Sequence, residues 1–79
     1  MTPTLENLSE AVAAELRAAL AYSGTSYGQL ASVLGVPVMW VSRRCRGVVD
    51  LSVNDLAAMC EAADLDLVTV LTSAIGASK

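Results

Sequence analysis

Residues 27–47 read YGQLASVLGVPVMWVSRRCRG, and this stretch decides the fold. Ser26 lies just before it and Gln29 follows three residues later, which is the spacing of a capping box at the start of a helix. Gly35 marks the end of that helix, because glycine readily adopts the left-handed conformation found after helix C-termini. Pro37 suits the cap or first turn of a second helix. The stretch therefore predicts two short helices separated by a tight turn.

A connection this short, centred on Gly35, makes the two helices cross steeply, which is the geometry of a helix-turn-helix. One of the two helices then projects its outer face away from the body of the protein. The length and exposure of such a helix suit the major groove of double-stranded DNA. We therefore expect the helix at residues 37–46 to present a surface that reads DNA.

The rest of the chain shows apolar residues at the steps of three or four that are typical of amphipathic helices. Helix caps are expected at Thr4, Ser52 and Asp66, and residues 23–25 should end the first helix. The predicted fold is all-α, with five short helices in one domain that covers the whole chain and frays over residues 76–79. Outside residues 37–46, the residues expected to face the core are Leu5, Leu8, Val12, Leu16, Leu20, Leu30, Ala31, Val33, Leu34, Val53, Leu56, Met59, Cys60, Ala63, Leu67, Val70, Leu71 and Ile75.

The composition argues against several classes of function. A chain of 79 residues can bury a modest core but not a cofactor-sized cavity. The sequence has no histidine, its cysteines Cys45 and Cys60 lack the spacing of metal ligands, and its serines lack a nucleophile-elbow context. We therefore expect no enzyme activity, metal, cofactor or small-molecule substrate, and two reduced cysteines that fill the core. No apolar run reaches the ~18 residues of a membrane span and no signal-peptide pattern starts the chain, so a cytoplasmic protein is expected.

The net charge of −3 is unusual for a protein that binds nucleic acid, but the charge is unevenly distributed. Three of the five basic residues, Arg43, Arg44 and Arg46, lie within four positions, and the acidic residues lie elsewhere. A basic patch on an acidic body can still bind DNA. The alternative interpretation is a solvated helix face without specificity. We expect Arg17, outside this patch, to pair with nearby acids.

Several segments resemble the Cro/cI-repressor family of helix-turn-helix proteins. Residues 26–37 (SYGQLASVLGVP) are similar to its second helix, glycine and turn, and residues 41–47 (VSRRCRG) to the end of its recognition helix. Residues 51–56 (LSVNDL) and 62–67 (AADLDL) resemble its fourth helix and the start of its fifth. The resemblance implies a five-helix, lambda-repressor-like DNA-binding domain with the helix-turn-helix at helices 2 and 3. The pair of arginines before the final glycine resembles small regulators of actinobacteria and their phages.

The sequence departs from the family pattern at three positions. Asp64 stands where the family usually has glycine, so we expect a strained helix end there. Gly28 lowers the helix propensity of the second helix. Cys45 replaces a larger residue, which predicts a looser core beneath the third helix.

The helical wheel of residues 37–46 separates a core side from a DNA side. Pro37, Val41 and Cys45 should face the core. The expected base contacts are Val38, Met39, Ser42 and Arg43, and the expected phosphate contacts are Tyr27, Gln29, Arg44 and Arg46. Arg43 is the main candidate, because a guanidinium can bridge guanine O6 and N7. Trp40 fits packing against the fourth helix as well as it fits a contact surface.

These observations together predict a sequence-specific regulator of transcription that binds double-stranded DNA as a homodimer, in the manner of a phage or prophage repressor that occupies its operator. The residues expected to form the dimer interface are Leu67, Val70, Leu71 and Ile75. A second hypothesis is a protein-interaction module with the same fold, such as an antitoxin-like or anti-repressor partner. A third is that the chain is the DNA-binding part of a longer repressor.

Overall fold

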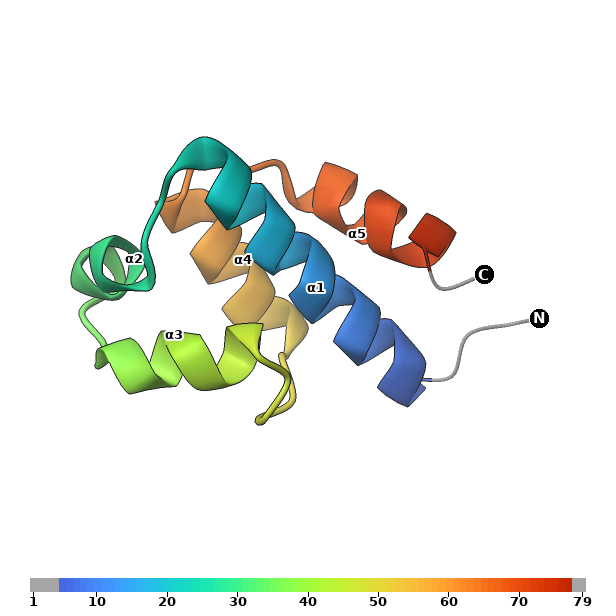
Figure 1. Cartoon of the computed structure of the whole chain (residues 1–79), viewed down its shortest axis with the longest axis horizontal. Coiled ribbons are helices and arrows are strands. Elements are labelled where there is room, and N and C mark those ends of the chain that lie inside the picture. The colour runs from blue at the N-terminus through green and yellow to red at the C-terminus, as the bar shows by residue number, and fades with distance from the viewer. Residues whose placement is uncertain (1–4, 78–79) are drawn as a thin grey trace.

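Five α-helices and no strands make up the part of the chain that the computed structural model describes, which is residues 5–77, with side chains described for residues 8–76. The helices are α1 (Leu5–Ser23), α2 (Tyr27–Leu34), α3 (Val38–Cys45), α4 (Val53–Ala62) and α5 (Leu67–Ala77) (Figure 1). The all-α, five-helix prediction is confirmed. The expected cap at Thr4 lies outside the described residues. Helix α5 continues through Gly76 and Ala77, and fraying of this end stays a prediction.

The predicted caps form where the sequence places them. The Ser26 hydroxyl accepts the Gln29 backbone N–H at 3.0 Å, and the Gln29 Oε1 accepts the Ser26 N–H at 2.8 Å, which completes the capping box of α2. The Ser52 hydroxyl accepts the Asp55 N–H at 3.0 Å at the start of α4. Asp66 precedes α5, and its carboxylate accepts a backbone N–H two residues later. Local side-chain chemistry therefore sets these three helix starts.

Helices α1 to α4 end in one common motif. A residue with a positive φ lies directly after α1 and α2, and one residue later after α3 and α4. In each case the next N–H bonds to a carbonyl five residues back, as in a Schellman motif. The positive-φ residues are Gly24, Gly35, Gly47 and Asp64. The closing bonds run from Thr25 to Leu20, Val36 to Ala31, Val48 to Arg43 and Leu65 to Cys60. Asp64 has φ +58°, so it holds a left-handed conformation that costs a residue with a Cβ, as the sequence predicted.

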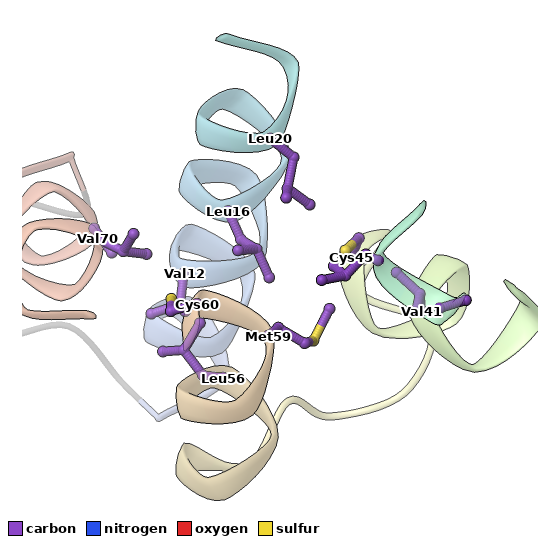
Figure 2. Close-up of a cluster of buried hydrophobic side chains, with 12 residues drawn as sticks. Val12, Leu16, Leu20, Val41, Cys45, Leu56, Met59, Cys60 and Val70 are labelled. Carbon is purple, nitrogen blue, oxygen red and sulfur yellow. The ribbon is translucent and has the colours of Figure 1, made fainter. Parts of the chain in front are cut away.

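The core lies where α1 and α4 meet, with α3 on one side and α5 on the other (Figure 2). Met59 of α4 extends toward Val41 and Cys45 of α3. The largest fully buried side chains are Leu16, Leu20, Leu30, Met59, Val41, Cys45 and Cys60. Both cysteines are free and buried, so they fill the core as predicted.

Three residues of α2, α4 and α5 that are predicted to face the core are exposed instead: Val33, Val53 and Ile75. Ile75 is 45% exposed because it lies in the last turn of α5. Val33 is exposed because it lies about 100° around α2 from the centre of the face formed by Leu30, Ala31 and Leu34. Val53 is exposed because it is the first residue of α4, at the edge of the core. Short helices bury only a narrow stripe, and a residue one position outside it reaches solvent.

The arrangement leaves α3 with a free outer side. Helices α3 and α5 lie on opposite sides of α1 (Figure 1), and α3 packs against α1 and α2. None of the described helices is long and apolar enough to cross a membrane.

Candidate nucleic-acid interface

The turn between α2 and α3 fixes the angle at which α3 leaves the body. Gly35 has φ +70°, and the N–H of Val36 bonds to the Ala31 carbonyl at 3.1 Å, so the chain reverses directly after α2. A Cβ at Gly35 would meet nothing within 4 Å, so the backbone conformation and not lack of space favours glycine there. Pro37 then acts as N-cap of α3, exposed and extended, rather than facing the core as expected. These features form the predicted helix-turn-helix.

Helix α3 turns one side inward and presents the other to solvent. Val41 and Cys45 are completely buried, as the wheel predicted. Val38 is 51% exposed and Met39 is 60% exposed, although both are large apolar side chains. Arg43 is exposed and Ser42 is half-buried. The four residues expected to contact bases therefore lie on or beside one accessible surface, which we call the reading face (Val38, Met39, Ser42, Arg43).

The Arg44 side chain makes three contacts within the protein. Its Nε lies 3.1 Å from Oδ2 of Asp55 on α4, its guanidinium carbon lies 3.9 Å from the centroid of the Trp40 ring, and its NH1 donates to the Trp40 carbonyl. Asp55 neutralises the charge that a phosphate contact would need. A phosphate contact by Arg44 therefore stays a prediction, and it would require the guanidinium to leave Asp55. Trp40 is a packing residue half-buried beneath Arg44.

Tyr27 and Gln29 lie at the start of α2, as expected for residues near a DNA phosphate. Gln29 is exposed, and because its Oε1 is used in the capping box, its amide NH₂ remains a donor toward solvent. Tyr27 is half-buried against the core. Burial, followed by the neighbouring Cys45 thiol, raises the pKa of Tyr27, so its hydroxyl is protonated at neutral pH.

Arg17 makes a contact that the sequence did not predict. Instead of pairing with acids, its NH1 donates to the backbone carbonyl of Cys45 and links α1 to the C-terminal end of α3. Arg17 and Arg46 line one hollow of about 230 Å³, together with Glu10, Ala13 and Gly47. No sequence signal identifies this contact, because an arginine on an amphipathic helix usually faces solvent.

The cysteines have ordinary core chemistry. Burial raises the pKa of the Cys45 thiol to about 11 and also raises the pKa of the Cys60 thiol. Both are therefore uncharged thiols at neutral pH. Among the described residues, no group of three or more His, Cys, Asp or Glu side chains gathers in a way that could hold a metal ion.

The residues expected at a dimer interface have different surroundings. Val70 is only 5% exposed and belongs to the core of a single copy, because it packs toward α1. Leu67 and Leu71 are half-buried against the same core. Ile75 is 45% exposed, and Val68, two turns earlier on α5, is 67% exposed. Only part of the expected interface is therefore accessible.

The fold and the reading face define a helix-turn-helix protein of the DNA-binding class. A family model described as a helix-turn-helix domain matches residues 11–72, and the chain belongs to this family. The Cro/cI type suggested by the sequence is supported by a solved structure. The crystal structure of the clp gene regulator ClgR from C. glutamicum is similar to this chain, with 33% sequence identity and a TM-score of 0.82. The similarity covers 89% of this chain and 91% of that one. No curated protein matches the chain.

Proposed function

We propose that this protein is a sequence-specific regulator of transcription that binds double-stranded DNA through α3. The observation that carries the proposal is the reading face, where Val38 and Met39 are 51% and 60% exposed beside Arg43. Apolar side chains placed beside an arginine on one face of a helix suit contact with thymine methyl groups in the major groove. Similarity to a protein described as a gene regulator supports a role in transcription.

The proposed contacts divide by chemistry. Arg43 reads guanine, Val38 and Met39 contact thymine methyls, and Ser42 hydrogen-bonds a base edge. Gln29, Tyr27 and Arg46 bind backbone phosphates, supported by the unpaired amides at the start of α2. In this division, base contacts give sequence specificity and phosphate contacts hold α3 in register.

We propose repression as the outcome, because a small protein bound across a promoter blocks access to it. A phage or prophage origin follows only from the sequence resemblance and stays a prediction.

A homodimer is part of the proposal, because one helix-turn-helix reads few base pairs and two copies would read half-sites one DNA turn apart. The accessible apolar residues of α5, Val68 and Ile75, are where a symmetric contact would form. Sedimentation at high micromolar concentration tests this. We expect the wild type to sediment as a dimer and the variant Val68→Glu to sediment as a monomer. A wild type that stays monomeric throughout the concentration range would contradict dimerisation.

Selection from a random duplex library tests the main proposal. We expect rounds of binding and amplification to enrich one short motif that contains a G·C pair. A homodimer should enrich the motif as an inverted repeat with centres about 10 base pairs apart. The variant Arg43→Ala should lose that enrichment. A wild-type protein that enriches no motif would contradict sequence-specific binding.

The alternative is a protein-interaction module of the same fold, and the net charge of −3 favours it. Salt distinguishes the two. DNA binding releases counterions and weakens steeply as salt rises, whereas an apolar protein contact changes little.

A further inference from the structure

Few positively charged side chains are present to contact DNA. The described part of the chain contains four cationic side chains, Arg17, Arg43, Arg44 and Arg46. Asp55 neutralises Arg44 at 3.1 Å, and Arg43 belongs to the reading face. Because DNA affinity depends on neutralised phosphates, the remaining two arginines carry most of the backbone contact.

Those two arginines lie together although they come from different helices. Arg17 of α1 and Arg46 at the end of α3 line the same hollow of about 230 Å³. Both also act on one neighbour, since the positive charge of each opposes the upward shift of the Tyr27 pKa. Arg17 and Arg46 are therefore near each other and near the start of α2, where phosphate contacts are expected.

The hydrogen bond to the Cys45 carbonyl fixes the Arg17 side chain in a position from which it can bind a phosphate. It holds the guanidinium at the end of α3 and leaves the other N–H donors of the group for a ligand. A side chain that is already fixed loses less conformational entropy on binding. Both arginines are exposed, so a phosphate can reach them without rearrangement of the core.

We propose that Arg17 binds one further backbone phosphate of DNA at the C-terminal end of α3, beside the phosphate that Arg46 binds. The inference rests on the proposed function and adds a contact from α1, outside the helix-turn-helix itself. Glu10 also lines the hollow, so its carboxylate opposes the bound phosphate and weakens binding.

The test is the salt dependence of binding to a random-sequence duplex, followed by fluorescence anisotropy between 50 and 200 mM salt. Arg17→Gln removes the charge and keeps a donor for the Cys45 carbonyl. We expect it to reduce the slope of log K against log salt by about 0.9, the value for one phosphate on duplex DNA. The affinity of the wild type should therefore fall about 3.5-fold more than that of the variant across this range. Arg44→Gln is the matched control and should leave the slope unchanged, because Asp55 already neutralises Arg44.

A purely structural role for Arg17 would change stability and not the slope. Circular dichroism and the emission of Trp40 identify the temperatures at which each variant is folded, and the titrations are made there. Glu10→Gln changes the hollow without touching Arg17, and we expect it to bind DNA more tightly than wild type. Wild-type binding with an unchanged slope in Arg17→Gln would overturn this inference alone. An absence of wild-type binding to any duplex at low salt would overturn the proposed function as well.

Discussion

Arg44 Nε lies 3.1 Å from Asp55 Oδ2, so the helix that follows the recognition helix neutralises one of its arginines. The same guanidinium stacks 3.9 Å over Trp40. The pair is partly exposed, with 18% and 28% of the two side chains accessible, so its electrostatic contribution is modest. Its structural effect is to connect α3 to α4.

Removing this connection should loosen α3. We expect Arg44→Ala to lower the free energy of unfolding by about 1 kcal/mol, from the lost ion pair and the lost cation–π contact. Trp40 is the single tryptophan of the chain, so its emission should change in the folded state. Urea unfolding followed by circular dichroism and fluorescence measures both effects. Arg46→Ala, at an exposed arginine, is the control, and an equal loss in both variants would show that the Asp55 contact contributes nothing.

Arg43 should determine sequence preference. Replacing it with alanine removes a bidentate contact to guanine and should cost about 1–3 kcal/mol on the enriched site. The loss on random-sequence DNA should be smaller, because that binding depends on phosphates. Competition titrations on the two duplexes measure the ratio. Equal losses on both would place Arg43 on the backbone instead of in the groove.

Asp64 offers a stabilising substitution. It has φ +58° in a position that glycine occupies in the other three Schellman motifs. We expect Asp64→Gly to raise the free energy of unfolding by about 1 kcal/mol, because glycine adopts this conformation without a Cβ clash. Thermal and urea unfolding measure the change. Asp64→Ala separates conformation from charge: it removes the carboxylate but keeps the Cβ, and stabilisation by alanine equal to that by glycine would contradict the conformational explanation.

Burial of Cys45 gives the fold an alkaline limit. Its pKa rises from 9.0 to about 11 because the thiolate is costly in the core. A raised folded-state pKa means that the contribution of the thiol is fully present below pH 9 and is lost as pH rises toward 11. We expect the difference in unfolding free energy between wild type and Cys45→Ala to shrink over that interval. A constant difference from pH 8 to 11 in urea titrations would show that the folded and unfolded thiols titrate alike.

Helix boundaries could be predicted from the sequence because they depend on neighbours in the chain. The capping box of Ser26 and Gln29 starts α2, and Gly35 ends it, so both ends follow from residues at the ends themselves. The strain at Asp64 follows from an aspartate at a helix end where the backbone favours glycine. Periodicity identified most of the core for the same reason. It failed at Val33, Val53 and Ile75, where the buried stripe is narrower than the pattern of apolar residues.

The contacts of long charged side chains could not be predicted, because they depend on which helices pack together. The partner of Arg44 lies 11 residues further along the chain, and the carbonyl that Arg17 contacts lies 28 residues away. A charge pattern gives the sign and position of a group but not its reach in space. The exposed side of α3 could be predicted because it depends only on the helical wheel. The contacts of Arg17 and Arg44 within the protein required the structure.

The most direct test of the central claim is the affinity of the wild-type protein for its enriched duplex and for a scrambled duplex as salt is varied, measured by fluorescence anisotropy. We predict binding to the enriched site at least about 10³-fold tighter than to the scrambled one, with both affinities falling as salt rises. Equal affinity for the two duplexes, or no binding to either at low salt, would contradict a sequence-specific DNA-binding regulator.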